Sequence, residues 1–219
     1  MGVKLYGLPM STCTARALIC LEEKQVDYEF LHVNLFTAQH KQPSFLSKNP
    51  FGQIPVLEDG DDLTIFESRA ISTYIAEKYK NNNTTDLLRQ GVLKEATLVK
   101  VWMEVEAQRY EPVIRPITYQ HFVAPLSGKT SDQSIIDQNL EKLGKVLDVY
   151  EDKLSCTKYL AGDYYTLADL HHFPCTHYFM KTPYASLINS RPRVKAWWED
   201  ISSRPAFKKV AENMKYGKN

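Results

Sequence analysis

The pattern of apolar residues changes once along the chain, near residue 81, and this change restricts the fold more than any other feature. Before residue 81, short alternating runs typical of strands are separated by stretches of helical period; after it, every convincing pattern is helical. The change coincides with a polar run, residues 81–85, that has no apolar period. We therefore predict two domains, an α/β domain over residues 1–80 and an all-helical domain over residues 92–219, joined by a linker over residues 81–91.

The first domain has the pattern of a βαβ unit followed by a hairpin and a helix. A strand, a helix and a second strand in succession imply a parallel strand pair, because the crossover brings the chain back to the same sheet. Two apolar runs that flank an acidic turn containing Gly60 indicate the hairpin. The expected strands cover residues 3–6, 28–33, 54–58 and 63–66, and the expected helices cover residues 11–23 and 67–80.

The second domain has only helical signals. Residues 92–124 carry apolar side chains at near-helical intervals, although Pro112 and Pro116 should kink or interrupt a helix there. Thr166 and Asp169 have the spacing of a capping box, with aspartate in place of the usual glutamate. These signals predict a helical bundle without strands.

Composition excludes several classes of function. The 219 residues carry 27 Lys and Arg against 26 Asp and Glu, and the net charge of +1 gives no general attraction to nucleic acid or to a membrane surface. No segment approaches the ~20 apolar residues of a membrane span, and the N-terminus has neither the basic start nor the apolar stretch of a secretory signal. The cysteines form no C-x-x-C pair, so we expect free thiols in a reducing compartment. We therefore expect a cytosolic protein that binds neither nucleic acid nor membrane.

The loop before the first helix carries two candidate reactive groups. Ser11 stands where an N-cap is expected, and a helix N-terminus favours an anion. Its hydroxyl can instead donate a hydrogen bond to a ligand thiolate and so lower the pKa of that thiol from near ~8.5. Cys13 has two interpretations, a redox nucleophile with a depressed pKa or a small buried apolar residue. A serine hydrolase is disfavoured because no G-x-S-x-G elbow surrounds Ser11.

A second candidate region combines a proline turn with a helix start. Ile54 and Pro55, directly before a strand, suit a cis turn that exposes a backbone N–H and C=O to a peptide-like ligand. Glu67 and Ser68 open a helix, where the Ser68 N–H can take a carboxylate and Glu67 can hold an ammonium. Each feature alone is typical of an ordinary turn or cap.

A cluster of metal-ligating residue types occurs later in the chain, at His171, His172, Cys175 and His177. Their spacing fits no standard zinc pattern, and the adjacent His171 and His172 would point in different directions on a helix. We therefore expect structural roles for them and no bound metal.

Several motifs, taken in order, resemble those of one known family. They are Ser11, the pair His40 and Lys41, NPFGQIP at residues 49–55, FESRA at residues 66–70 and ADLHH at residues 168–172. In this order they resemble the cytosolic glutathione transferases, and most closely the plant phi class. The resemblance runs from Val3 to about Lys208.

The resemblance implies a glutathione transferase fold, with an α/β thioredoxin-like N-terminal domain and an all-α C-terminal domain. It implies a serine-type enzyme in which Ser11 stabilises the thiolate of glutathione, a co-substrate and not a permanently bound cofactor. Arg16 is expected to be structural. The residues implied to bind glutathione are Ser11 and Thr12 at the sulfur, His40 and Lys41 at the glycyl carboxylate, Gln53, Ile54 and Pro55 at the cysteinyl part, and Glu67 and Ser68 at the γ-glutamyl end.

The resemblance also implies two kinds of partner. The subunits would pair as a homodimer in which Phe51 docks into the neighbouring subunit. A hydrophobic electrophile would bind between the domains, in a pocket lined by Met10, Thr12, Phe36, Tyr119, Phe122 and Tyr178.

The implied activity is conjugation of glutathione to hydrophobic electrophiles, with reduction of organic hydroperoxides as a second reaction of the same thiolate. Two alternatives stay open. One is a ligandin-type carrier that binds flavonoids or other aromatics without chemistry. The other is a thioltransferase in which Cys13 forms the mixed disulfide.

Overall fold

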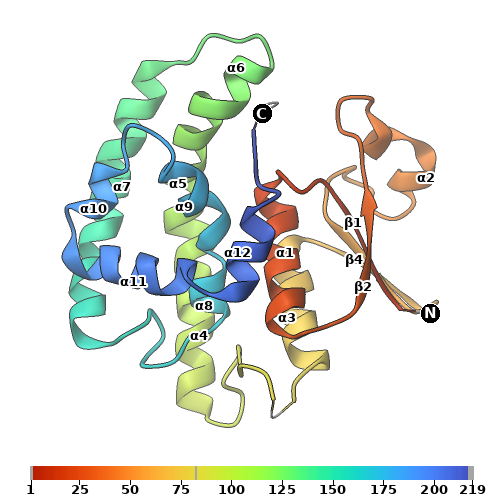
Figure 1. The fold of residues 1–219 in the computed structure, drawn as a ribbon, viewed down its shortest axis with the longest axis horizontal. Helices are drawn as coiled ribbons and strands as arrows, with labels where there is room; N and C mark the ends of the chain where they lie inside the picture. Colours follow the sequence, from red (N-terminus) through yellow and green to blue (C-terminus); the bar gives the residue numbers. More distant parts are fainter. Residues whose placement is uncertain (1, 82, 217–219) are drawn as a thin grey trace. The chain divides into compact units, whose positions relative to one another are not determined.

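The computed structural model describes residues 2–81 and 83–216, and within them the chain forms two compact units (Figure 1). The first unit ends at Asp86 and also contains Lys208–Lys215 from near the C-terminus. The second contains Leu87–Phe207 and Tyr216.

The first unit is built on a four-stranded mixed sheet. The strands are β1 (Val3–Gly7), β2 (Tyr28–His32), β3 (Val56–Asp59) and β4 (Leu63–Phe66), in the order β2-β1-β3-β4. β1 and β2 pair in parallel, as the βαβ pattern predicts, and β3 is antiparallel to both β1 and β4. The hairpin turn between β3 and β4 includes Gly60, whose φ of 68° lies in the left-handed region that glycine adopts without strain.

Helices cover both faces of this sheet. α1 (Thr12–Glu23) and α3 (Ser68–Lys78) pack against each other on one face, where Leu5, Ile19 and Ile71 are fully buried (Figure 1). Burial of one such side chain contributes about 1.5–3 kcal/mol. The short helix α2 (Pro43–Leu46), which follows the 3-10 turn η1 (Gln39–Lys41), belongs to the other face, where Phe45 packs with Val33 and Val56. This is the thioredoxin-like α/β architecture that the sequence predicts.

The second unit is helical, and no strand occurs among the described residues after Asp86. Its helices pack around α5 and α7, with α5 against α7 and α9, and α11 against α7. The helical elements after Asp86 are α4 (Leu93–Val105), η2 (Glu106–Tyr110), α5 (Glu111–Thr118), η3 (Tyr119–Val123), α6 (Ala124–Leu126), α7 (Gln133–Cys156), α8 (Leu167–Leu170), α9 (Phe173–Phe179), α10 (Ser186–Asn189), α11 (Pro192–Ser202) and α12 (Pro205–Ala211).

The prolines do not break the helical path between residues 93 and 126, because the backbone changes its hydrogen-bond period around them. The segments η2 and η3 are π-helical turns; each precedes a proline, Pro112 and Pro125, at the start of the following helix. A proline cannot donate the i→i−4 bond and its ring crowds the carbonyl four residues earlier, so a wider turn accommodates it. Pro116 lies inside α5. At Pro112 the helix is therefore widened locally, where the sequence predicts a kink or an interruption.

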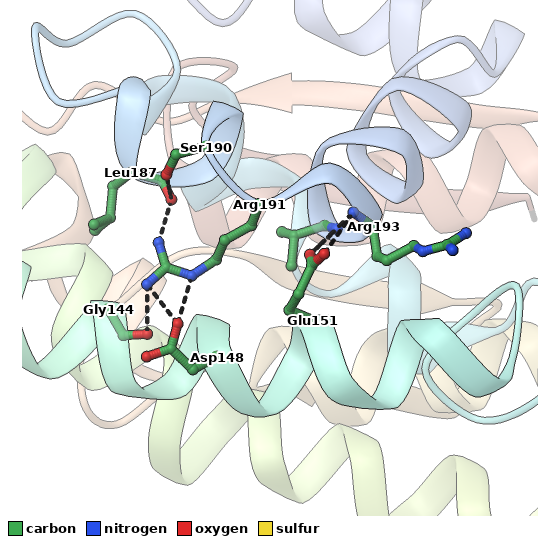
Figure 2. Close-up of polar contacts among 8 residues, drawn as sticks. Gly144, Asp148, Glu151, Leu187, Ser190, Arg191 and Arg193 are labelled. Carbon is green, nitrogen blue, oxygen red and sulfur yellow. Dashed lines mark hydrogen bonds and ion pairs between the residues drawn. The ribbon is translucent and has the colours of Figure 1, made fainter.

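Carboxylates of α7 hold the start of α11 in place (Figure 2). The Glu151 carboxylate accepts the backbone N–H groups of Arg193 and Val194, at 3.0 Å each, and so satisfies donors that a helix N-terminus leaves unpaired. Arg191 pairs with Asp148 at 2.6 Å and donates to two backbone carbonyls, those of Leu187 and Gly144. These contacts tie α10 and α11 to the long helix α7.

Within residues 2–81 and 83–216, no helix combines sufficient length with sufficient apolar character to span a bilayer.

Candidate functional site

Most of the predicted residues of the first unit belong to segments that meet at one edge of its sheet. β1 and β2 run in parallel, and their last residues, Gly7 and His32, are paired. β3 runs in the opposite direction, so its first residue, Val56, pairs with Tyr6 near the end of β1 and with Phe66 at the end of β4. The segments that enter or leave the sheet at this edge are the Ser11 loop, residues 33–41, residues 49–55 and Glu67.

Ser11 is the N-cap of α1, as one of its two interpretations predicts. Its hydroxyl oxygen accepts the Thr14 backbone N–H at the long distance of 3.4 Å. The loop is held close to the sheet, since a Cβ on Gly7 would lie 2.5 Å from the Thr14 side chain. Ser11 is half-buried, and no acceptor for its hydroxyl proton occurs among the described residues. That proton is therefore available to a ligand.

A buried arginine links α1 to the first turn of α3. The Arg16 side chain is fully buried, and its guanidinium donates to the Ser68 hydroxyl oxygen at 2.7 Å. Because that oxygen acts as the acceptor, the Ser68 proton can point to another group. The same guanidinium lies 4.0 Å from the sulfur of the half-buried Cys13. Arg16, which is expected to be structural, thus makes a specific contact with the Ser68 hydroxyl.

Glu67 precedes α3 in a backbone conformation that few non-glycine residues adopt, with φ of 70° and ψ of 107°. Such conformations cost about 1–3 kcal/mol and occur often at ligand sites. The Glu67 side chain is exposed, while the adjacent Ser68 is buried. A carboxylate and a hydroxyl therefore stand side by side at the start of this helix.

The turn over residues 49–52 is shaped by its own polar groups. The Asn49 side chain accepts the Phe51 N–H at 3.0 Å and donates to the Gln53 carbonyl at 2.8 Å. Lys41 donates to the carbonyls of Phe51 and Gly52 at 3.1 and 3.0 Å. Gly52 has φ of 57°, and a Cβ there would lie 2.8 Å from the His40 carbonyl, so only glycine fits. Lys41, which is predicted to bind the glycyl carboxylate of glutathione, thus also stabilises the turn that carries Phe51.

The remaining predicted glutathione-binding residues lie around the same turn. His40 is half-buried, its Nδ1 has no hydrogen-bond partner among the described residues, and burial and the charge of Lys41 lower its pKa. The peptide bond between Ile54 and Pro55 is cis, as expected, and the Gln53 side chain is exposed. Thr12, the first residue of α1, is half-buried.

The residues predicted for an electrophile pocket divide between the two units. In the first unit Met10 and Thr12 are half-buried, and Phe36 is 82% exposed. In the second unit Tyr119 is 39% exposed, whereas Phe122 and the buried Tyr178 contact each other with ring centroids 5.8 Å apart. Among these aromatic residues, the structure brings Phe122 and Tyr178 together.

In the histidine-rich segment of the second unit, the hydrogen bonds of His172 indicate a structural role for that residue. His172 Nδ1 lies 2.7 Å from the Ala168 carbonyl, which can only accept, so Nδ1 carries the proton and Nε2 accepts the Tyr150 hydroxyl at 2.8 Å. The nearby capping box is confirmed: the buried Asp169 carboxylate accepts the Thr166 N–H at 3.0 Å. Both ring nitrogens of His172 are therefore occupied by protein groups. Within residues 2–81 and 83–216, no three or more His, Cys, Asp or Glu side chains are placed to hold a metal ion.

Two contacts that involve predicted site residues were missed by sequence reasoning. One is the bond from Arg16 to Ser68, which joins residues far apart in the chain. The other is the packing of Tyr216 on Phe122 and Tyr178. Neither has a motif, because each depends on how distant segments pack.

Comparisons with known proteins find similarity over nearly the whole chain. A family model described as the glutathione S-transferase N-terminal domain matches residues 1–77, and one described as its C-terminal domain matches residues 93–205. Glutathione S-transferase F13 of Arabidopsis thaliana is 58% identical over 98% of this chain and 97% of that protein. The crystal structure of glutathione transferase F7 from Populus trichocarpa superposes with a TM-score of 0.95 at 67% identity, covering 98% of this chain and all of that one. A maize enzyme, glutathione S-transferase I in complex with an atrazine glutathione conjugate, superposes with a TM-score of 0.91 at 50% identity, covering 98% of each chain.

Proposed function

We propose that this chain, which belongs to the glutathione S-transferase family and to its plant phi class, uses Ser11 to stabilise the thiolate of glutathione. The chain is a glutathione transferase, which joins the sulfur of glutathione to a hydrophobic electrophile. The observation that carries the role of Ser11 is its free hydroxyl proton at the N-terminus of α1. A hydrogen bond donated to the sulfur favours the charged form of the thiol, and each unit by which its pKa falls corresponds to about 1.4 kcal/mol.

The nucleophile in this reaction is the sulfur of the bound ligand. Ser11 therefore stays protonated and forms no covalent bond. The thiolate attacks the electrophilic carbon and forms a thioether. In a substitution the leaving group departs with its bonding electron pair. In an addition the product takes up a proton. In the proposed second activity the thiolate attacks an oxygen of an organic hydroperoxide, the O–O bond breaks, and the departing alkoxide takes up a proton to leave as an alcohol. The glutathione sulfenic acid that remains reacts with a second glutathione to give the disulfide and water.

The proposed glutathione contacts follow the groups that the sheet edge presents. Ser68, oriented by Arg16, donates its hydroxyl to the α-carboxylate of the γ-glutamyl end, and the exposed Glu67 carboxylate takes the ammonium beside it. Thr12 lies beside the sulfur. The cysteinyl part binds along Gln53, Ile54 and Pro55, and the glycyl carboxylate binds His40 and Lys41, where the lysine has a third proton to donate beyond the two that hold the Phe51 turn.

The electrophile is proposed to bind a largely apolar and aromatic set of side chains. Glutathione is a co-substrate here and no permanent cofactor is required. The proposed electrophile contacts are Met10, Thr12, Phe36, Tyr119, Phe122 and Tyr178.

We also propose a homodimer in the cytosol. Phe51 is 64% exposed on a turn that Asn49 and Lys41 hold in shape, so a large apolar ring is presented ready to dock into a second subunit. The cytosolic location rests on the resemblance to cytosolic glutathione transferases and on the four cysteines, all of which are free thiols. Sedimentation of Phe51→Ser against the unchanged chain tests the dimer; equal masses would contradict it.

The test of the proposed function measures the conjugation of glutathione to chlorodinitrobenzene by the unchanged chain, by Ser11→Ala and by Cys13→Ser. We expect Ser11→Ala to lose about 10- to 50-fold in kcat, and to raise the pKa of the bound thiol, with a smaller change in glutathione affinity. Cys13→Ser, a change in the same turn of α1, is the matched control and should retain turnover. A Ser11→Ala variant with unchanged turnover would remove Ser11 from the mechanism.

The same experiment separates the alternatives. Loss of activity in Cys13→Ser alone, with a glutathione adduct on the unchanged chain that a reductant removes, would indicate the thioltransferase. Saturable binding of aromatic dyes without any turnover would indicate the carrier.

A further inference from the structure

A lysine, a glutamate and a tyrosine form a cluster on one face of the sheet in the first unit. The Lys48 ammonium donates to the Glu58 carboxylate and lies over the Tyr6 ring, 5.0 Å from its centroid. The Tyr6 hydroxyl donates to the other oxygen of that carboxylate, at 2.7 Å. Tyr6 and Glu58 belong to the paired strands β1 and β3, and Tyr6 also packs against the apolar cluster that contains Phe45 of α2. Lys48 is therefore attached to both strands.

The ion pair in this cluster is partly buried. The side chains of Lys48 and Glu58 are 30% and 18% exposed. Although burial opposes the shift, hydrogen bonds from Lys48 and Tyr6 lower the pKa of the Glu58 carboxyl below its ordinary value, so this group is a carboxylate at neutral pH. A pair with this much exposure adds little to the stability of a fold. Its effect is therefore sought in the segment that Lys48 begins.

Lys48 stands directly before the turn over residues 49–52, which Lys41 also contacts. The backbone N–H groups of Lys48 and Asn49 both donate to the Phe45 carbonyl, at 2.9 and 3.0 Å, so the end of α2 leads directly into this turn. Lys41 donates to the carbonyls of Phe51 and Gly52. The position of the Lys41 ammonium thus depends on the turn, and the α2 end of the turn is anchored to β1 and β3 through Lys48.

We propose that Lys48, held by Glu58 and Tyr6, is a positioning residue for the glycyl end of glutathione. Lys48 acts through the turn, which sets the place of the Lys41 ammonium, and it does not itself contact the ligand. This inference rests on the proposed function, because it requires glutathione to bind with its glycyl carboxylate at His40 and Lys41. A group that is already held in place loses less conformational freedom when its ligand binds. Without the anchor, the turn and the Lys41 ammonium would occupy a wider range of positions.

The anchor should therefore matter only for a ligand whose glycyl end is charged. Lys41 attracts a carboxylate as a point charge, and this attraction depends on the distance between the two charges. An ester in place of the carboxylate removes that charge and leaves the rest of the tripeptide unchanged. The sulfur and the γ-glutamyl end, which are proposed to bind Ser11 and Ser68, should not respond to the loss of Lys48.

The experiment measures the conjugation of chlorodinitrobenzene to two thiols that differ only at the glycyl end. One is glutathione, and the other is its glycyl ethyl ester. Both KM and kcat are determined for each thiol with the full-length unchanged chain and with the variants Lys48→Met, Glu58→Gln and Lys48→Arg. The methionine variant keeps an apolar stem and removes the ammonium, whereas the glutamine variant keeps the shape of the side chain and removes its charge.

Lys78→Met is the matched control, because Lys78 makes the same kinds of contact elsewhere on this sheet. Its ammonium pairs with Asp59, the neighbour of Glu58 in β3, at 2.5 Å and lies over the Tyr74 ring, 5.7 Å from its centroid. Lys78 belongs to α3 and not to the segment that carries Lys41. Loss of this second lysine–carboxylate pair should therefore leave the KM for both thiols unchanged.

We expect Lys48→Met to raise the KM for glutathione about 3- to 5-fold, with kcat and the KM for the ester each within about 1.5-fold of the unchanged chain. Glu58→Gln should act in the same direction. Lys48→Arg should restore the KM for glutathione, because a guanidinium also donates to a carboxylate. An equal rise in KM for both thiols would overturn the inference, since it would indicate general damage to the site. So would an unchanged KM for glutathione, an equal effect of Lys78→Met, or an arginine variant that behaves like Lys48→Met.

The unchanged chain distinguishes failure of the inference from failure of the proposed function. If the unchanged chain conjugates neither thiol, the proposed function fails, and the inference fails with it. If its KM is the same for glutathione and for the ester, the proposed glycyl contacts fail, and the inference that depends on them also fails. If the unchanged chain prefers glutathione and Lys48→Met retains that preference in full, the inference alone fails.

Discussion

Polar side chains at the sheet edge of the first unit differ from those around α8 of the second unit in how many of their hydrogen-bonding groups are paired within the protein. The Asp169 carboxylate is fully buried and accepts four hydrogen bonds, from Leu160 N, from Thr166 N and Oγ1, and from Trp197 Nε1. Ser11, in contrast, accepts one long bond and keeps its proton, and the Nδ1 atom of His40 has no partner among the described residues.

This difference separates polar groups that hold a fold from those that are left to hold a ligand. A buried polar group costs free energy unless it is paired, so a structural cluster is saturated by the protein itself. A binding site must leave some donors and acceptors unpaired within the protein. Partial exposure to water lowers the free-energy cost of leaving them unpaired. His172, whose two ring nitrogens are both paired, and the half-buried Ser11 therefore differ in what they can still bind, although both are candidate reactive residues in the sequence.

The largest expected effect is on stability, from removal of the Asp169 carboxylate that accepts four hydrogen bonds. Asp169→Ala leaves four donors without their acceptor in a buried site, and we expect a loss of about 3–5 kcal/mol in the free energy of unfolding. Urea unfolding followed by circular dichroism measures it. Asp163→Ala is the matched control: that exposed aspartate accepts one backbone N–H, from Lys158, and its loss should cost less than about 1 kcal/mol. Equal losses in the two variants would contradict the comparison.

The second effect is a pH dependence of stability that comes from the same residue. Burial raises the pKa of Asp169 to about 6, although hydrogen bonds from Leu160, Trp197 and Thr166 oppose the shift. An unfolded aspartate titrates near ~3.9, so the folded chain binds an extra proton between about pH 4 and pH 6. The contribution of this group to stability is therefore largest at the acid end of that window and is lost as the pH rises through about 6.

Asp169→Asn, which does not titrate, isolates this contribution. Between about pH 6.5 and about pH 4.5, the unfolding free energy of the unchanged chain should rise relative to that of Asp169→Asn by about 2 kcal/mol. Denaturant titrations at the two pH values measure the difference. Parallel pH profiles would show that the four hydrogen bonds outweigh burial and that Asp169 stays ionised.

The smallest expected effect is on glutathione binding, from removal of a hydroxyl group at the sheet edge. Ser68→Ala removes the hydroxyl that Arg16 orients, and we expect the KM for glutathione to rise about 5- to 10-fold with a smaller change in kcat. Ser72→Ala, one turn later in α3, is the control because that hydroxyl bonds the Arg69 carbonyl within its own helix. A glutathione KM that responds equally to both changes would indicate a general effect on α3 and no carboxylate contact at Ser68.

Much of the fold was predictable because its signals are local. The alternation of residues 3–6, the apolar period of α1 and the acidic turn at Gly60 are each determined by near neighbours, and the observed strands and helices agree with them to within a few residues. The capping box at Thr166 and Asp169 was predicted for the same reason. The helical path through Pro112 was predicted less well, because the energy of a widened turn depends on the helices packed around it.

The candidate site was only partly predictable. The motifs around Ser11 and around residues 49–55 named residues, but their contacts depend on segments distant in the sequence. Nothing near Lys41 in sequence indicates that its ammonium holds the carbonyl of Phe51, and nothing near Arg16 indicates Ser68. Tyr216 had no signal because its segment has no apolar period.

The sequence by itself determined the two-part architecture, the parallel strand pair and the family, since periodicity and ordered motifs are properties of the chain. Only the tertiary structure decided which polar groups are saturated and which are left free. His172 became structural because Tyr150 and Ala168 use both of its nitrogens, whereas Ser11 retained its proton because no packed neighbour accepts it within the described residues. The physical reason is that a hydrogen bond is a short-range pairing of groups, and its partners are known only once distant segments have packed together.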